Sequence, residues 1–387
     1  AFLIASGAVH RHLCQNVHGK RIRKLRQGFL RPGDAASGLC LHDPPCSGFQ
    51  AFYQGIISGC VALRLCCGKK LSIGPLQRYQ RSGAVPHAAV CPNEIRRVNV
   101  NIAATTEEEY HMLKEAGIGT YILFQETYHK ESYETLHPTG PKHDYCYHTE
   151  AMDRAMEGGI DDVGLGVLFG LELYKYEFAG LLMHAEHLEA VHGVGPHTIS
   201  VPRIKRADDI DPNTFDNGIS DEIFAKLCAL IRVAVPYTGM IISTRESQKV
   251  REKVIRLGVS QISGGSRTSV GGYQEEVRPT DTEQFDVSDQ RTLDEVVKWL
   301  MELGYIPSFC TACYREGRTG DRFMSLCKNG QILNCCHPNA LMTLTEYLVD
   351  YASEETKKHG FELIEKELEK IPKEKVREIA RKNIEDI

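Results

Sequence analysis

The sequence predicts an α/β fold, a parallel sheet or (βα) barrel followed by a helical, cysteine-rich C-terminal domain. Six short apolar strands alternate with helix-patterned segments between about residues 91 and 291. That order is typical of a βα barrel. Beyond Thr292 the alternation ends, and helical segments flank a predicted loop at 310–337 that contains five cysteines.

The predicted strands are short apolar runs bounded by polar residues or glycine. They span residues 97–103, 120–125, 162–169, 198–201, 240–243 and 261–263. Helices are predicted at 105–117, 150–158, 174–192, 220–235 and 245–257, and C-terminal helices at 292–303, 340–353 and 355–386. An eight-stranded barrel needs two further βα units, so the predicted barrel lacks its first two.

Residues 1–90 differ in character from the rest of the chain. They contain twelve basic and two acidic residues, a net charge of +10, whereas residues 91–387 contain 34 basic and 49 acidic residues, a net charge of −15. No helix-length periodicity runs through this basic segment. The preferred interpretation is that residues 1–90 are out of frame, or otherwise foreign to the domain that follows. A basic, disordered arm is the alternative, which six cysteines and many apolar residues fit poorly.

The composition of the whole chain argues against several classes of protein. No run of eighteen apolar residues is present, so no membrane span is expected. The net charge of −5 gives no sign of nucleic-acid binding. His10, Arg11 and His12 interrupt the apolar start, which argues against an export signal. A cytoplasmic protein is therefore expected. In that compartment its fourteen cysteines are expected to bind a metal or cluster rather than to form disulfides.

The strongest chemical signal is a set of cysteines near the C-terminus. Cys310 and Cys313 have CxxC spacing, and Cys336 follows after 22 intervening residues. Two thiolates from one turn and a third from a distant segment can bind one metal centre. Three cysteines would hold a 4Fe–4S cluster and leave its fourth iron open. The alternatives are free thiols, or a structural zinc site that adds two of Cys327, Cys335, Cys336 and His337 to the CxxC pair.

This CX2CX22C motif after a βα barrel resembles the auxiliary-cluster motif of the HydG-type tyrosine lyases, radical S-adenosylmethionine enzymes that mature FeFe-hydrogenase. The resemblance begins at about residue 91 and extends through the segments 94–101, 125–129, 137–141, 152–170, 195–203, 243–246 and 264–269. The 2-iminoacetate synthases of thiamine biosynthesis share the barrel and lack the terminal cysteine motif. Residues of about 195–300 also look like the domain shared by biotin and thiamine synthesis enzymes.

The resemblance implies a carbon–carbon lyase with tyrosine as its substrate and hydrogenase maturation proteins as partners. S-adenosylmethionine and a reductive 4Fe–4S cluster would supply a 5′-deoxyadenosyl radical that cleaves tyrosine to p-cresol and dehydroglycine. The auxiliary 4Fe–4S cluster would serve the formation of iron-bound CO and cyanide. The family binds its reductive cluster through CX3CX2C, a spacing that residues 1–90 lack. A 2-iminoacetate synthase and a catalytically dead metal-binding remnant therefore remain alternatives.

In a βα barrel, ligands bind at the carboxyl ends of the strands. The resemblance places Gln125, Glu126 and Arg154 against the amino-acid part of S-adenosylmethionine, because Glu suits an ammonium group and a guanidinium suits a carboxylate. A structural ion pair between Glu126 and Arg154 is the alternative. The strand glycines expected to let the backbone approach adenine closely are Gly164, Gly166 and Gly170.

The later strands supply candidates for the substrate and for a second metal ligand. Ser243, Arg245, Ser263 and Arg267 are expected to hold the tyrosine carboxylate, with a purely structural role as the alternative. His197 begins its strand at the opposite end, which should face the cysteine domain. Neutral imidazole is a good iron ligand, so His197 could hold an extra iron beside the auxiliary cluster, or else be a core histidine. No catalytic acid or base is assigned.

Overall fold

The computed structural model describes residues 2–6, 98–206, 211–267 and 287–387. Except for residues 2–6, the segment 1–90 and the predictions made for it lie outside these ranges. The described strands form one sheet in the order β2-β3-β4-β5-β6-β1-β7. Their bounds are β1 (Phe2–Ser6), β2 (Tyr121–Ile122), β3 (Val163–Gly166), β4 (Thr198–Ser200), β5 (Gly239–Ile242), β6 (Gln261–Ser263) and β7 (Ile306–Ser308).

Strands β2 to β6 run parallel to one another, as the alternation with helices predicted. The predicted strand 97–103 is reduced to an isolated parallel bridge between Val100 and Tyr121. Backbone bonds continue beyond β2, since Gln125 N donates to Gly166 O at 2.8 Å. Strand β1 pairs antiparallel with both β6 and β7, and neither pairing was predicted. The sheet thus extends to Ser308, beyond the expected end of the barrel at residue 291.

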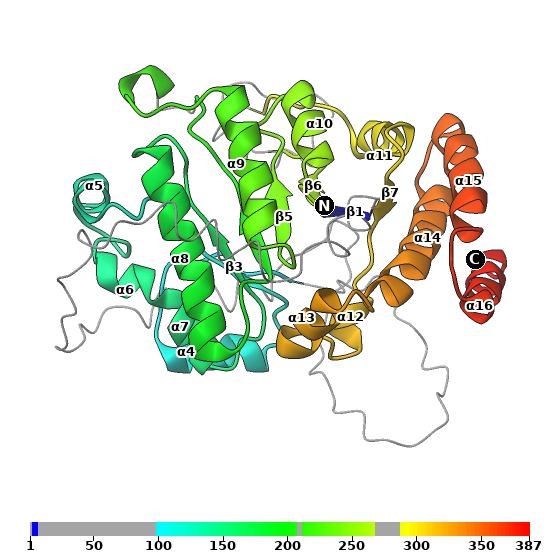
Figure 1. The fold of residues 1–387 in the computed structure, drawn as a ribbon, viewed down its shortest axis with the longest axis horizontal. Helices are drawn as coiled ribbons and strands as arrows, with labels where there is room; N and C mark the ends of the chain where they lie inside the picture. The colour runs from blue at the N-terminus through cyan, green and yellow to red at the C-terminus, as the bar shows by residue number, and fades with distance from the viewer. Residues whose placement is uncertain (1, 7–97, 207–210, 268–286) are drawn as a thin grey trace, which may run out of the picture. The chain divides into compact units, whose positions relative to one another are not determined.

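The predicted barrel helices are present within two or three residues of their expected ends. They are α4 (Glu107–Glu115), α7 (Ala151–Glu157), α8 (Tyr174–His192), α9 (Asp221–Ala234) and α10 (Gln248–Arg256). Helices α8, α9 and α10 stand side by side along the parallel strands (Figure 1). Thr106, Ser220 and Ser247 cap α4, α9 and α10, each accepting from the backbone N–H three residues later.

Two short helices between β2 and α7 were not predicted, α5 (Lys130–Leu136) and α6 (Tyr145–Thr149). Neither is long enough to show two full turns of amphipathic pattern, which a prediction from sequence periodicity requires.

The core between the sheet and the longer helices is apolar. Leu165, Ile199, Phe224 and Val254 are all at most 2% exposed.

The C-terminal region is helical, as predicted, and its boundaries differ from the prediction. It contains α11 (Leu293–Glu302), α12 (Ala312–Arg315), α13 (Gly320–Lys328), α14 (Leu333–Asp350), α15 (Glu354–Leu368) and α16 (Glu374–Glu385). The predicted loop at 310–337 is wrong, because α12, α13 and the start of α14 occupy most of it. Pro338 lies inside α14. Since proline usually interrupts a helix, its presence led to a predicted helix start after Pro338, and the first turn of α14 was missed.

The predicted single helix 355–386 is divided into α15 and α16 at the segment around Pro372. Both pack against α14, and α15 also packs against α11 (Figure 1). Across the described residues, no helix combines the length and the apolar character that a membrane crossing requires.

Candidate functional site at the two ends of the sheet

The amino-terminal ends of three neighbouring strands are covered by the segment that carries the cysteines. Thr120, Asp162 and His197 stand directly before β2, β3 and β4. The Tyr314 hydroxyl lies 3.2 Å from Thr120 Oγ1 and 3.3 Å from His197 Nε2. Gly320 N, at the start of α13, donates to Asp162 Oδ1 at 3.1 Å. The expectation that this end faces the cysteine domain is confirmed.

His197 is held on several sides at this junction and is 9% exposed. Its Nδ1 lies 3.5 Å from Asp162 Oδ1, and its ring centroid lies 4.9 Å from that of Phe323. The second oxygen of Asp162, Oδ2, is buried and has no hydrogen-bond partner among the described residues. The imidazole is therefore fixed between the strand ends and α12–α13, and its role as an iron ligand stays a prediction.

The three motif cysteines come from three elements of the C-terminal region. Cys310 follows β7, Cys313 lies on α12, and Cys336 lies near the start of α14. Ala312 N donates to Cys310 Sγ at 3.4 Å. Burial, then the neighbouring Cys313 and Cys310 thiols, raise the pKa of Cys336 to about 12. These thiols therefore lie within electrostatic reach of one another.

The donor set fits an iron–sulfur cluster chemically. Thiols bind iron as thiolates, and nearby N–H donors stabilise the sulfur charge. Burial raises the pKa of Cys313, and the hydrogen bond from Arg318 acts in the opposite direction. As the described side chains stand, no three from Cys, His, Asp and Glu form a group that could hold a metal ion. The auxiliary cluster of Cys310, Cys313 and Cys336 therefore stays a prediction.

The zinc alternative draws on the same segment with different donors. Cys327 is 7% exposed on α13, and Cys335 precedes Cys336 on α14. His337 Nε2 lies 3.2 Å from Glu367 Oε2, so this imidazole already has a carboxylate partner. Cys327, Cys335 and Cys336 then remain as the other candidate donors, and the zinc site with the CxxC pair stays an alternative.

At the carboxyl end of β2, a hollow of about 320 Å³ is bounded by a charged pair. Glu126 and Lys142 line it together with Asn101, Ile102, Ala103, Leu123 and Phe124. Lys142 Nζ lies 2.6 Å from Glu126 Oε1. Gln125 is 4% exposed, and its Nε2 donates to Thr149 Oγ1 at 2.8 Å. Lys142 was not singled out from the sequence, although it directly follows the quoted segment 137–141.

Arg154 lies away from this charged pair. Its Nε donates to Thr105 O at 3.0 Å, and its guanidinium lies 3.8 Å from the centre of the Tyr147 ring. Its carboxylate partner is Glu150, at 3.8 Å. The alternative of a Glu126–Arg154 ion pair is wrong, because each of these residues pairs with a different neighbour.

Two of the three predicted adenine-facing glycines are required by close packing of side chains. A Cβ on Gly166 would lie 2.5 Å from Phe124 Cδ1, and one on Gly164 would lie 2.7 Å from Thr198 Oγ1. Gly170 has a φ of +112°, a conformation that favours glycine. These contacts explain the glycines without a ligand, and their approach to adenine stays a prediction.

The predicted substrate residues lie at the carboxyl ends of β5 and β6. Arg245 N donates to Ser243 Oγ at 3.3 Å, and Arg245 donates through one terminal nitrogen to Lys205 O at 3.4 Å. Ser263 O accepts from the buried Arg251. Arg267 is half-buried beyond β6.

A buried ion cluster that the sequence did not predict lies between the ends of β4 and β5. Arg203 donates to both carboxylate oxygens of Glu246, at 2.7 and 2.6 Å, and to Asp221 at 2.5 Å. Both Arg203 and Glu246 are more than 90% buried. Both residues lie in segments that resemble the HydG-type lyases, 195–203 and 243–246. That resemblance was the signal in the sequence that could have pointed to them.

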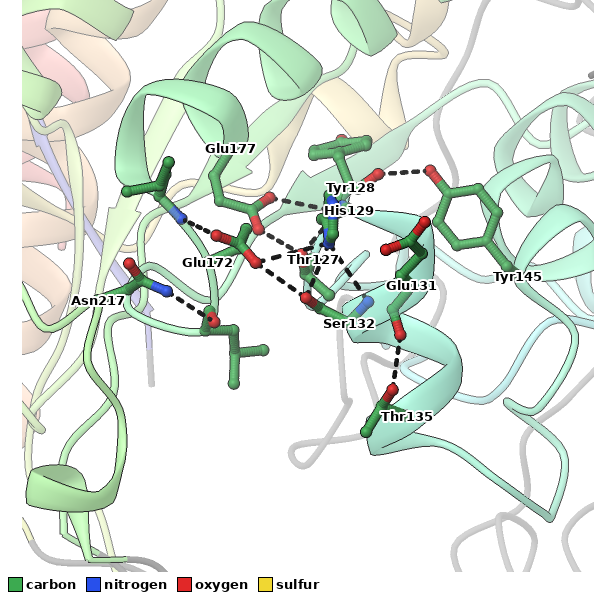
Figure 2. Close-up of polar contacts among 12 residues, drawn as sticks. Thr127, Tyr128, His129, Glu131, Ser132, Thr135, Tyr145, Glu172, Glu177 and Asn217 are labelled. Atoms are coloured by element: carbon green, nitrogen blue, oxygen red, sulfur yellow. Dashed lines mark hydrogen bonds and ion pairs between the residues drawn. The ribbon is translucent and has the colours of Figure 1, made fainter. Parts of the chain in front are cut away.

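The loop that follows Glu126 is bound to the start of α8 (Figure 2). Glu177 accepts from the Thr127 hydroxyl and, at 2.9 Å, from Tyr128 N. His129 Nδ1 lies 2.8 Å from Ser132 Oγ, which donates to Glu172 Oε2 at 2.9 Å. Burial raises the pKa of Glu177, and the two hydrogen bonds act in the opposite direction.

Comparison with known proteins relates this architecture to two enzyme groups. Residues 200–306 match the family described as the Biotin and Thiamin Synthesis associated domain, close to the expected 195–300. The chain is 30% identical over 225 residues to the 2-iminoacetate synthase of Escherichia coli, a match that covers 57% of this chain and 58% of that protein. The same enzyme of Salmonella typhimurium is 28% identical over 225 residues.

Two solved structures are similar over a larger part of the chain. One is HydG, described as a maturase of the FeFe-hydrogenase, with 60% identity and a TM-score of 0.74. It aligns with 76% of this chain, which spans 64% of that protein. The other is the FeFe-hydrogenase maturase HydG of Carboxydothermus hydrogenoformans, with 41% identity, a TM-score of 0.63, and coverage of 75% of this chain and 63% of that one. The chain thus spans less than two thirds of the length of each relative.

Proposed function

We propose that this chain, which is HydG-like in sequence and fold over its described part, carries the substrate barrel and auxiliary-cluster domain of a radical S-adenosylmethionine tyrosine lyase. The substrate is tyrosine, the products are p-cresol and dehydroglycine, and hydrogenase maturation proteins receive iron-bound CO and cyanide. The observation that supports this most is the position of the cysteine segment against Thr120, Asp162 and His197. It gives the sheet a cysteine end opposite the end where barrel enzymes bind substrates.

At the carboxyl ends of the strands, the proposal assigns binding and orientation to charged side chains. Glu126 would accept the ammonium of S-adenosylmethionine, and Arg245 with Ser243 would hold the tyrosine carboxylate. S-adenosylmethionine with its reductive cluster supplies the hydrogen-abstracting radical when both are bound. The surrounding apolar core would keep water from the reacting carbon, which radical chemistry requires.

At the amino-terminal ends, the proposal assigns metal binding. Cys310, Cys313 and Cys336 would hold the auxiliary 4Fe–4S cluster, which leaves one iron open to a small ligand. His197 would bind an extra iron through the imidazole edge that now meets Tyr314. Asp162, beside Nδ1, would fix the tautomer and the orientation of the ring.

A 2-iminoacetate synthase is the second candidate, because the chain is 30% identical to the enzyme of Escherichia coli over 225 residues. That activity shares tyrosine cleavage and does not account for the Cys310, Cys313 and Cys336 set.

Residues 1–90 lack the CX3CX2C triad, so the proposal includes a frame break before residue 91. An alternative frame upstream should encode CxxxCxxC, and its absence from every frame would contradict the frame break.

The metal half of the proposal is tested by anaerobic reconstitution and electron paramagnetic resonance. We expect a reducible 4Fe–4S signal that Cys310→Ser abolishes and the control Cys327→Ser leaves nearly intact. About four or five irons per chain would indicate one cluster site, and about eight or nine the full complement. One tightly bound zinc per chain with no paramagnetic signal would overturn this assignment. A signal with no product formation would indicate the inactive remnant.

The two ends of the sheet are tested separately in a chimera that restores the N-terminal βα units. Arg245→Ala should lose p-cresol formation, because misplacing the reacting carbon by about 1 Å can cost roughly a hundredfold. His197→Ala should keep p-cresol and lose CO, which is trapped on reduced haemoglobin. Equal loss of both products in His197→Ala would show that this residue only supports the barrel.

A further inference from the structure

Glu126 has a backbone conformation that needs support from its surroundings. Its φ is +65°, and no other described residue except glycine has a positive φ. Glutamate seldom adopts this left-handed region, because its Cβ approaches the backbone too closely. Leu168 N donates to Glu126 O at 2.9 Å, which fixes one side of the residue. The following residues must be held as well, since they set the direction of the Glu126 side chain toward the hollow.

Glu177 holds those following residues. It lies in the first turn of α8 and is 0% exposed. One carboxylate oxygen accepts from the Thr127 hydroxyl and the other from Tyr128 N at 2.9 Å (Figure 2). The Thr127 hydroxyl oxygen also accepts from His129 N at 3.1 Å. A carboxylate is rarely buried unless its oxygens are hydrogen-bonded, and the helix N-terminus stabilises it further.

The same face of α8 receives the side chain of Tyr128. A Cβ on Gly180 would lie 2.5 Å from Tyr128 Cγ, so the tyrosine ring lies directly against the helix at this glycine. Farther along, the Tyr128 hydroxyl lies 3.0 Å from His184 Nδ1. The positions 177, 180 and 184 have the spacing of one helix face. On the loop side, the Tyr145 hydroxyl donates to Tyr128 O at 2.7 Å.

We propose that Glu177, Gly180 and His184 form a positioning face that locks Thr127 and Tyr128, and thereby aims the Glu126 carboxylate at the ammonium group of an amino-acid ligand. Glu177 touches no ligand and acts through the loop. The inference rests on the proposed function, in which Glu126 accepts the ammonium of S-adenosylmethionine. It adds that binding of the amino-acid part depends on α8, whereas binding of the adenosine part does not.

Two probes separate these parts, S-adenosylhomocysteine and 5′-methylthioadenosine, which lacks the amino-acid end. We measure the binding of each to the full chain by titration calorimetry. Glu177→Ala should weaken S-adenosylhomocysteine about tenfold, or about 1.4 kcal/mol, and change 5′-methylthioadenosine less than about twofold. Glu177→Gln, which keeps an acceptor for Tyr128 N, should restore most of the affinity and also serves if Glu177→Ala does not fold. Glu131→Ala is the matched control, because Glu131 is exposed on the neighbouring α5 (Figure 2).

Amide hydrogen exchange without ligand tests the lock itself. Glu177→Ala should raise exchange in residues 127–129, and Glu131→Ala should not. Equal weakening of both probes, or no weakening of either, would overturn the positioning role while the proposed cofactor site stands. If the unsubstituted chain binds neither probe, the proposed cofactor site is wrong. The positioning face would then have no amino-acid ligand to act on.

Discussion

Asp289→Ala should be one of the most damaging single substitutions in the barrel, because it leaves a buried cation without its counter-ion. Arg251 is 0% exposed on α10, and Asp289 is 4% exposed before α11. Asp289 accepts from Arg251 and, at 2.8 Å, from Arg291 Nε. Burial lowers the pKa of Arg251, and the attraction of Asp289 opposes that shift. Without the carboxylate, the hydrogen bond from Arg251 to Ser263 O remains.

The expected loss follows from the burial of this pair. Removing one partner of a buried ion pair typically costs about 3–5 kcal/mol, because the remaining charge stays desolvated. Arg291 is partly exposed and can turn toward water, so it adds little to that cost. The free energy of unfolding in Asp289→Ala should therefore fall by about 3–5 kcal/mol.

Urea titration monitored by circular dichroism measures this loss, with Asp216→Ala as the matched control, since Asp216 is exposed. Replacing the pair by apolar residues should restore much of the stability, because no charge is then buried. The double variant Arg251→Met with Asp289→Ala should accordingly be more stable than Asp289→Ala alone. A loss below about 1 kcal/mol in Asp289→Ala, or a double variant no better than the single one, would refute the reasoning.

Two further predictions concern the C-terminal helices and the strand glycines. Burial would raise the pKa of Asp294, but hydrogen bonds from Ser353 and Thr356, at 2.7 and 2.9 Å, leave it below its ordinary value. Asp294→Asn should thus cost about 1–2 kcal/mol at pH 7, and urea titrations should show that difference shrinking below about pH 4; a constant difference would contradict it. Gly166→Ala should lower stability by about 1–3 kcal/mol, and Phe124→Leu should restore it by clearing the 2.5 Å contact. If 5′-methylthioadenosine binding stays weak after that rescue, Gly166 also serves the adenine; if it returns fully, packing alone explains the glycine.

Elements with a strong periodic pattern were predicted well from the sequence. The prediction of a helix at 220–235 agrees closely with α9 (Asp221–Ala234), and the one at 245–257 agrees with α10 (Gln248–Arg256). Their apolar spacing is a property of the local sequence, and the tertiary structure does not alter it. Strand β7 and helix α12 have three and four residues, too few to show a period. Their existence depends on packing against distant parts of the chain.

The candidate site divides in the same way between local and distant information. Residue types at strand ends predicted roles for Glu126, Arg245 and His197. Sequence reasoning could not supply the partners, because Lys142 meets Glu126 across sixteen positions and Tyr314 meets His197 across 117. The CxxC pair was a strong signal because both thiols lie within one turn of the chain. Glu177 gave no signal, since a glutamate in an amphipathic helix is usually solvated.

The length of one strand explains why the two half-reactions of the proposal can be separated by mutation. His197 and Arg203 bracket β4 and stand at its opposite ends, six residues apart. At about 3.3 Å per extended residue, a separation of six residues corresponds to at most roughly 20 Å. The two side chains also have separate partners, since His197 lies beside Asp162 and Arg203 pairs with Glu246. Backbone strain carried through β4 could couple them, and the parallel bonds of β4 to β3 and β5 oppose such strain. Loss of p-cresol in His197→Ala would accordingly mean that the sheet had moved, and hydrogen exchange in Thr198–Ser200 would detect that movement independently.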